Sequence, residues 1–335
     1  MALYRKLLLS TGGGVTSNVD KDKQEACATI AIGLGGTGVD CLRTLKRRVY
    51  ESIEPDVPDA LTPSYSHIKF LAVDSDKKSL AADEKLHSLD VDTEFFDISN
   101  TNIQKLLQNA QTYASKPEEE WLTTANEETG APGISILSAS AGAGGVRQIG
   151  RLLLVEKADA FVSRVKSLIA AAKTTKAHEI NPDFNGASPL NIHIFTGMGG
   201  GTGSGTFLDV CYLVQRAIQE TGVTNVTTMG YFFLPDVNLC RPMIYGNEAI
   251  STYIKVNGLS AMKELNYCMD FESNGGAWDQ QYHGFHIGPL HKPPVMISHL
   301  ISSRSTDGTD YGENGYFYAL NVVCDFVMQF MVRND

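Results

Sequence analysis

Residues 197–205, GMGGGTGSG, constrain this chain more than any other stretch, because they contain six glycines and no charged side chain. Glycine loses more conformational freedom on folding than any other residue, so this concentration needs a compensating reason. A bound phosphate chain supplies one, since several backbone N–H groups must approach it closely and side chains would block them. A helix expected at 206–220 would point its positive end at the same place, and Thr202 and Ser204 would add hydroxyl groups.

The order of apolar segments along the chain predicts strands that alternate with helices. Expected strands cover residues 28–34, 67–73, 134–137, 191–196, 226–234 and 295–302. Expected helices cover residues 38–50, 76–86, 102–113, 146–172, 206–220, 244–265 and 316–332. This alternation predicts an α/β fold with a doubly wound, mostly parallel sheet and helices on both faces. Such sheets bind ligands beyond the carboxyl ends of their strands.

Each of the first four expected strands ends in a loop with a chemical signature. GLGGTG, VDSD, SASAGAGGVRQIGR and GMGGGTGSG follow them in that order. The glycine loops can expose backbone N–H groups to a phosphate chain. Outside the 197–205 run, the candidate residues are Gly35, Gly36, Thr37, Gly142, Ala143, Gly144 and Gly145. Asp74 and Asp76 are candidate Mg²⁺ ligands, because this ion prefers oxygen ligands and keeps several waters.

Other interpretations of these residues stay open. Gly33, Gly35 and Gly38 fit the G-x-G-x-x-G fingerprint of a dinucleotide site, which would indicate an NAD(P)- or FAD-dependent oxidoreductase. Such a protein has no need for two further glycine loops. Asp74 and Asp76 could instead form a solvated turn. No GxxxxGK[ST] motif occurs, so a P-loop is excluded.

Charge and composition narrow the classes of function. The net charge of −10 argues against a protein that binds nucleic-acid backbones. No stretch approaches the roughly 20 apolar residues of a membrane span. The six cysteines show no paired spacing, which is typical of reduced thiols in a cytoplasmic protein. A loosely spaced histidine group could hold a metal or lie in a solvated loop; it consists of His283, His286, His291 and His299.

Together these motifs resemble the tubulin/FtsZ superfamily. Residues 197–205 resemble the FtsZ loop GMGGGTGTG and the tubulin loop GGGTGSG. AGAGGVRQIGR at 141–151 resembles GAGGNPEVGR of FtsZ, and FLAVDSD at 70–76 resembles the segments that end in NTD or VDLE. GLGGTGVDCLRTLKRR at 33–48 and NGLSAMKEL at 257–265 favour the bacterial tubulin-like group.

The resemblance implies that the chain binds GTP or GDP with Mg²⁺, in a Rossmann-like domain. It places Gly35, Gly36 and Thr37 near the phosphates, and Asp74 and Asp76 near Mg²⁺ and the γ-phosphate. It makes Ala143, Gly144 and Gly145 the γ-phosphate sensor. Around the α- and β-phosphates it places Gly199, Gly200, Gly201, Thr202, Gly203 and Ser204. It assigns Asp236 to the ribose, and Tyr311 and Asn314 to the base.

The resemblance also implies a domain plan. Residues 1–27 form an N-terminal extension, and 28–311 form the nucleotide-binding domain, with insertions near 115–132 and 272–294 that are expected to be surface loops. Residues 312–335 begin a central helix, and the second, C-terminal domain of the family is absent.

The implied function is the GTPase domain of a filament-forming, cytoskeletal-type protein that assembles head to tail. Hydrolysis in the family needs a catalytic loop from a neighbouring subunit, so this chain would contain no catalytic residue and be weak or inactive alone. A nucleotide-sensing scaffold without polymerisation or turnover is the alternative. An NAD(P)-dependent oxidoreductase is a third hypothesis.

Overall fold

The computed structural model describes residues 28–53, 67–76, 88–100, 106, 121–122, 143–173 and 189–331. Several sequence predictions fall outside these residues. They are the N-terminal extension 1–27, the strand at 134–137, and, apart from single residues, the helices at 76–86 and 102–113 and the insertion at 115–132.

Six parallel strands form the central sheet, in the order β3-β2-β1-β4-β5-β8. Their bounds are β1 Ala28–Leu34, β2 Ile68–Asp74, β3 Phe95–Asp97, β4 Leu190–Gly197, β5 Val226–Phe233 and β8 Ile297–Ile301. β1 and β4 are buried almost throughout, as expected of parallel strands covered on both faces. The strand order reverses between β1 and β4, which makes this pair the topological switch point of the sheet. The short β3 is a strand that the sequence pattern does not predict.

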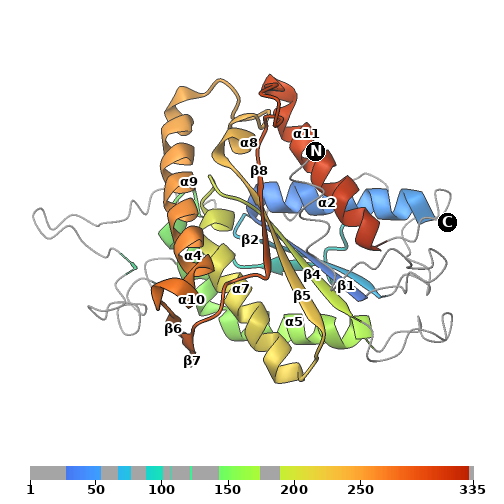
Figure 1. Cartoon of the computed structure of the whole chain (residues 1–335), viewed down its shortest axis with the longest axis vertical. Coiled ribbons are helices and arrows are strands. Elements are labelled where there is room, and N and C mark those ends of the chain that lie inside the picture. The colour runs from blue at the N-terminus through green and yellow to red at the C-terminus, as the bar shows by residue number, and fades with distance from the viewer. Residues whose placement is uncertain are drawn as a thin grey trace, which may run out of the picture.

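Helices cover both faces of the sheet, which confirms the predicted α/β class (Figure 1). On one face lie α2 Gly35–Ile53, α8 Pro235–Leu239 and α11 Gly315–Met331. On the other face lie α4 Arg147–Glu156, α5 Ala158–Lys173, α7 Thr202–Thr221 and α9 Glu248–Met269. The short α10 Phe271–Asn274 and the 3₁₀ helix η4 Gly312–Asn314 complete the helices described. None of the helices in the described ranges is long and apolar enough to span a bilayer.

Two predicted helices have different bounds in the structure. The predicted helix at 146–172 is two helices, α4 and α5, separated at Lys157. There the backbone leaves helical geometry, and the Lys157 ammonium donates to the carbonyl groups of Asp97 and Ser99. The predicted helix at 244–265 begins only at Glu248, because the Asn247 side chain accepts a hydrogen bond from the backbone N–H of Ile250 and caps it.

The helix predicted at 206–220 begins earlier than expected, at Thr202. Glycine disfavours helix, so the sequence points to a start beyond the TGSG segment. Tertiary contact overrides this preference, because a Cβ on Gly203 would lie 2.6 Å from Thr196 Oγ1 and 2.8 Å from the Leu34 carbonyl oxygen. The last part of the glycine run is therefore the first turn of α7, packed directly on the sheet.

The expectation of a surface loop near 272–294 is wrong for most of that segment. It contains an antiparallel hairpin of β6 Trp278–Tyr282 and β7 Phe285–Leu290. The Trp278 ring stacks on Tyr212 of α7 with 4.3 Å between ring centroids, and the Tyr282 hydroxyl donates to Asp209. These two aromatic residues extend the core over α7. The β6–β7 hairpin lies beside α10 in Figure 1.

Candidate functional site: a cavity at the switch point of the sheet

A cavity of about 310 Å³ lies at the carboxyl ends of β1, β2 and β4, where the strand order reverses. Nine of its lining residues are glycines, so much of its wall is bare backbone. It brings together the predicted residues Gly35, Gly36, Thr37, Ala143, Gly144, Gly145, Gly199, Gly200, Gly201, Thr202 and Gly203. Both predicted metal ligands, Asp74 and Asp76, also line it, and Ser204 does not. The four loops that the sequence singles out thus meet at one place. Of the third loop, only the part from Ala143 onward lies among the described residues.

The starts of α2 and α7 are in backbone contact at the floor of this cavity. Gly35 has φ +63°, a left-handed conformation that favours glycine. A Cβ on Gly35 would also lie 2.6 Å from the backbone nitrogen of Gly203. Only residues without side chains allow this approach, which sets the two helix N-termini side by side.

The N-termini of α2 and α7 line the cavity, and so does the turn that precedes α4. None of these three helices carries an acidic residue in its first turn, and no side chain caps α4 or α7. By contrast, α5, α8 and α9 each have an acid in the first turn. The first N–H groups of a helix have no partner within it, and its N-terminus carries partial positive charge. The N-termini of α2 and α7 therefore bring partial positive charge and N–H donors to the cavity wall, which suit an anion.

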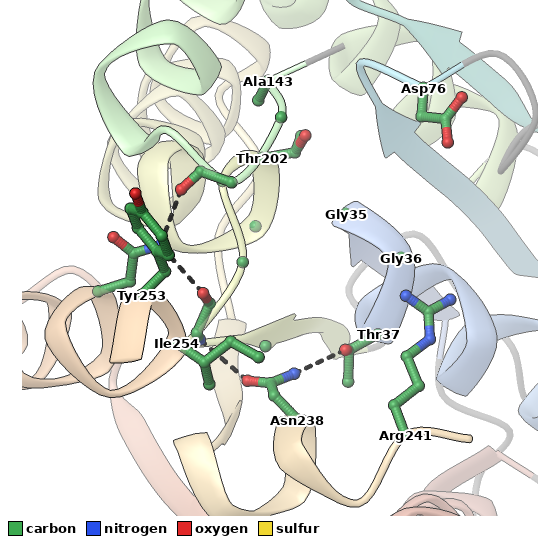
Figure 2. A pocket seen from close by; sticks show the side chains of 18 of the residues that line it. Gly35, Gly36, Thr37, Asp76, Ala143, Thr202, Asn238, Arg241, Tyr253 and Ile254 are labelled. Atoms are coloured by element: carbon green, nitrogen blue, oxygen red, sulfur yellow. Dashed lines mark hydrogen bonds between the residues drawn. The ribbon is translucent and has the colours of Figure 1, made fainter. Parts of the chain in front are cut away.

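Short polar side chains hold the loops in place. Ser75 Oγ accepts a hydrogen bond from the Ala143 backbone N–H at 2.9 Å and bonds to Thr202 Oγ1 at 2.6 Å. Asn238 donates to Thr37 Oγ1 at 2.8 Å and accepts from the Gly199 backbone N–H at 2.9 Å, as Figure 2 shows. The walls of the cavity are therefore cross-linked by hydrogen bonds.

Sequence reasoning missed four polar residues at this site, Ser75, Asn238, Arg241 and Asn257, and the apolar residues described below. Ser75 lies inside the VDSD segment, so its position offered a signal. Asn238 and Arg241 fall in the segment after β5, where the resemblance pointed only to a ribose contact. Asn257 lies in the middle of a helix, and no local pattern marks it.

Among the described residues that line the cavity, Arg241 is the only one with a basic side chain. Its Nη2 donates to Asp40 Oδ2 at 2.9 Å, and the Tyr316 hydroxyl donates to the same oxygen at 2.6 Å. A Cβ on Gly36 would lie 2.6 Å from Arg241 Nη1, so the guanidinium group covers the start of α2 (Figure 2).

Two carboxylates stand at the opposite end of the cavity. Asp74 is 3% exposed, and its Oδ1 accepts the backbone N–H groups of Ser75 at 2.7 Å and Asp76 at 3.2 Å. Burial raises the pKa of Asp74 above its usual value, and these two N–H groups oppose that shift. One or two carboxylates beside a phosphate are a set of ligands that Mg²⁺ commonly takes, so the residues fit this ion.

The described residues contain no group of three His, Cys, Asp or Glu side chains that could hold a metal, so the four histidines do not form one. His283 instead lies 3.5 Å from Glu156, and His286 pairs with Asp279.

The residues predicted for the ribose and base do not line the cavity. The Asp236 carboxylate accepts hydrogen bonds from Ser302 Oγ and from the backbone N–H of Ser303. The Tyr311 ring stacks on Tyr318 with 3.7 Å between ring centroids, and Asn314 is exposed at the end of η4. The remaining wall of the cavity is apolar and comes from α9 and the segment before it: Ile244, Ile250, Tyr253 and Ile254.

The fold and the cavity define an α/β domain of the doubly wound class with its ligand cavity at the switch point. A family profile described as "Tubulin like" matches residues 30–334, and the chain belongs to this tubulin-like family. This match confirms the resemblance to the tubulin/FtsZ superfamily.

Three of the solved structures that are similar to this chain share 12–14% sequence identity with it. GDP-bound CetZ1 from Haloferax volcanii has 14% identity and a TM-score of 0.43, with 90% of this chain and 60% of that chain covered. FtsZ from M. jannaschii, an empty dimer, has 14% identity and a TM-score of 0.42, with 98% and 57% covered. The GTPγS-form protofilament of TubZ from Bacillus thuringiensis serovar israelensis has 12% identity and a TM-score of 0.44, with 93% and 59% covered.

This chain therefore spans 57–60% of the length of these proteins. No curated protein sequence matches the chain significantly.

Proposed function

We propose that the chain binds GTP or GDP with Mg²⁺ in the cavity at the β1/β4 switch point. The observation that carries this proposal is a cavity wall of bare glycine backbone, built from the N-termini of α2 and α7 and from the turn before α4, none of which has a first-turn acid. A single small anion needs one such helix end, whereas several loops around one cavity suit a chain of phosphates. Membership of the tubulin-like family supports guanine as the base.

The phosphate chain would lie along the glycine loops. Gly35, Gly36 and Thr37 would contact it from α2, and the first turn of α7 with its preceding glycines, residues 199–204, would hold the α- and β-phosphates. The turn Ala143, Gly144 and Gly145 would meet the γ-phosphate. Asp74 and Asp76 would hold Mg²⁺, which would neutralise part of the phosphate charge when bound. Arg241 would supply a basic side chain.

The base would extend toward the start of α11. Tyr316 in the first turn of this helix shares Asp40 with Arg241, so this end of α11 adjoins the Arg241 side of the cavity. Asp236, Tyr311 and Asn314 stay the proposed ribose and base contacts. The Tyr311 ring stacks on Tyr318 with one face, and a purine would stack on the other face of this aromatic pair.

The wider proposal is a GTPase domain of a filament-forming protein, in which a neighbouring subunit supplies the catalytic acid and this chain supplies none. Exposed apolar side chains beside the cavity support head-to-tail self-assembly. They include Met243 at 90% exposure and Tyr253 at 70%, together with Tyr245 and Val256. The described cysteines are all free, which supports a cytoplasmic location.

Calorimetric titration of the purified chain with GTP, GDP, ATP and NAD⁺ in the presence of Mg²⁺ tests the proposal. We expect GTP and GDP to bind and the other two to bind far more weakly. Preference for NAD⁺ would favour the oxidoreductase hypothesis, and absence of any nucleotide binding would refute the proposal.

Light scattering and phosphate release with GTP then separate a filament-forming GTPase from a nucleotide-sensing scaffold. A scaffold would bind GTP but show neither signal, even when a catalytic loop from a longer relative is supplied in trans.

A further inference from the structure

The turn Ala143–Gly145 is held at both ends by side chains from other elements. Ser75 accepts the Ala143 N–H, and the Asn257 side chain donates to the Gly145 carbonyl oxygen at 2.9 Å. Gly144 and Gly145 have φ +55° and +83°, and the turn closes with a hydrogen bond from the Val146 N–H to the Ala143 carbonyl. A Cβ on Gly145 would meet no atom within 4 Å, so the turn is open on one side.

Asn257 serves two loops at once. Its Nδ2 also donates to the Gly199 carbonyl oxygen, at 3.0 Å. Gly145 precedes α4 and Gly199 precedes α7, so one amide group of α9 joins the two loops in front of both helices. Figure 2 shows the neighbouring Tyr253 and Ile254 of α9 beside the same cavity.

This double hydrogen bond fixes the direction of a donor. In a trans peptide group the C=O and N–H bonds point in opposite directions. Because Asn257 draws the Gly199 carbonyl toward α9, the N–H of Gly200 in the same peptide group must point away from α9. Gly200 lines the cavity, so this peptide group is one whose N–H a ligand can use.

The two loops depend on Asn257 to different degrees. Gly199 is also held through its own N–H by Asn238. The Gly145 carbonyl has no second partner among the residues described. Removal of the Asn257 amide should therefore release the Ala143–Gly145 turn and leave the Gly199 loop largely in place.

We propose that Asn257 is a positioning residue that sets the Ala143–Gly145 turn against the Gly199 loop, so that both turns bind the same phosphate chain. The inference rests on the proposed function, in which the Ala143–Gly145 turn contacts the γ-phosphate. Asn257 then determines how well the site distinguishes a triphosphate from a diphosphate.

The test compares GTP and GDP affinities of Asn257→Ala and Asn257→Asp, measured by calorimetry with Mg²⁺. The aspartate keeps the shape of the side chain and replaces the donor by an acceptor, so it serves if the alanine variant fails to fold. Asn266→Ala is the matched control, an exposed asparagine on the same helix. Loss of two ordinary hydrogen bonds predicts a Kd for GTP that rises about tenfold or more, with the Kd for GDP changed less than about threefold.

Equal weakening of GTP and GDP, or no change in either variant, overturns the inference while the proposed function stands. A wild-type chain that binds neither nucleotide overturns both. A merely structural role for Asn257 would lower the unfolding temperature without changing the ratio of the two affinities, and that outcome also refutes it.

Discussion

Gly200 offers a sharp test of the phosphate site, because nothing in the described structure itself requires a glycine there. Its φ is not positive, and a Cβ would meet no atom within 4 Å. The other described glycines with such open surroundings all have a positive φ. Gly200→Val should therefore fold normally, with a change in the free energy of unfolding within about 0.5 kcal/mol, as is usual for exposed positions.

The same substitution should abolish binding, because the isopropyl group would project into a cavity of only about 310 Å³. It would push the phosphate chain away from the N–H groups of this loop. Each hydrogen bond to a charged group contributes roughly 1.5–3 kcal/mol, so loss of two weakens binding by about 3–6 kcal/mol. At about 1.4 kcal/mol for each tenfold change, Kd for GTP should rise at least 100-fold.

Calorimetry and thermal unfolding of the same preparation provide the assay. Gly203→Val is the contrasting variant, since its Cβ would lie 2.6 Å from Thr196 Oγ1, and it should lose stability as well as binding. If Gly200→Val binds GTP with wild-type affinity, the phosphates lie elsewhere and the reasoning fails.

Three further predictions concern charge. Asp74→Asn should make GTP binding less sensitive to EDTA in calorimetric titrations, because it removes one of the two carboxylates proposed for Mg²⁺. Burial lowers the pKa of His193 from 6.5 to about 3, so below pH 6.5 the unfolded state binds a proton that the folded state does not. The free energy of unfolding should therefore decrease as the pH is lowered, by about 2 kcal/mol at pH 5 from this group. In urea unfolding, the free energy of unfolding of His193→Phe should decrease less steeply as the pH is lowered. Arg151→Ala should lower the free energy of unfolding by about 3–5 kcal/mol, because Asp209, 2% exposed, would lose its charged partner, whereas Arg304→Ala, at an exposed pair, should cost about 0–1 kcal/mol.

Each of these predictions has a clear contrary result. An unchanged effect of EDTA on binding after loss of Asp74, identical pH profiles with and without His193, or equal losses in the two arginine variants would contradict them.

The sheet and the phosphate loops could be predicted from the sequence because both depend on local pattern. Buried parallel strands read as continuous apolar runs, and β1 and β4 were placed within one residue at each end. A glycine run after a strand has few alternative explanations, and the loops meet because parallel strands end at one edge of the sheet.

What could not be predicted depends on contacts between distant residues. The early start of α7 follows from the packing of Gly203 on β1 and β4, which no helix propensity contains. The β6–β7 hairpin is stabilised by the contacts of Trp278 and Tyr282 with α7, and its Gly- and His-rich composition suggests a loop. Asn257 acts on residues more than fifty positions away, so its role is visible only in three dimensions.

The shared oxygen of Asp40 has a consequence for how the cavity and the last helix respond to each other. Arg241 and Tyr316 both donate to this oxygen, and the Arg241 guanidinium lies 5.9 Å from the centre of the Tyr316 ring. An anion that attracts Arg241 competes directly with the Asp40 carboxylate for the Arg241 guanidinium group. Asp40 would then keep the Tyr316 hydroxyl and, 3.9 Å from its other oxygen, the Arg43 guanidinium as partners, and the balance of forces at the first turn of α11 would differ between the empty and the filled cavity.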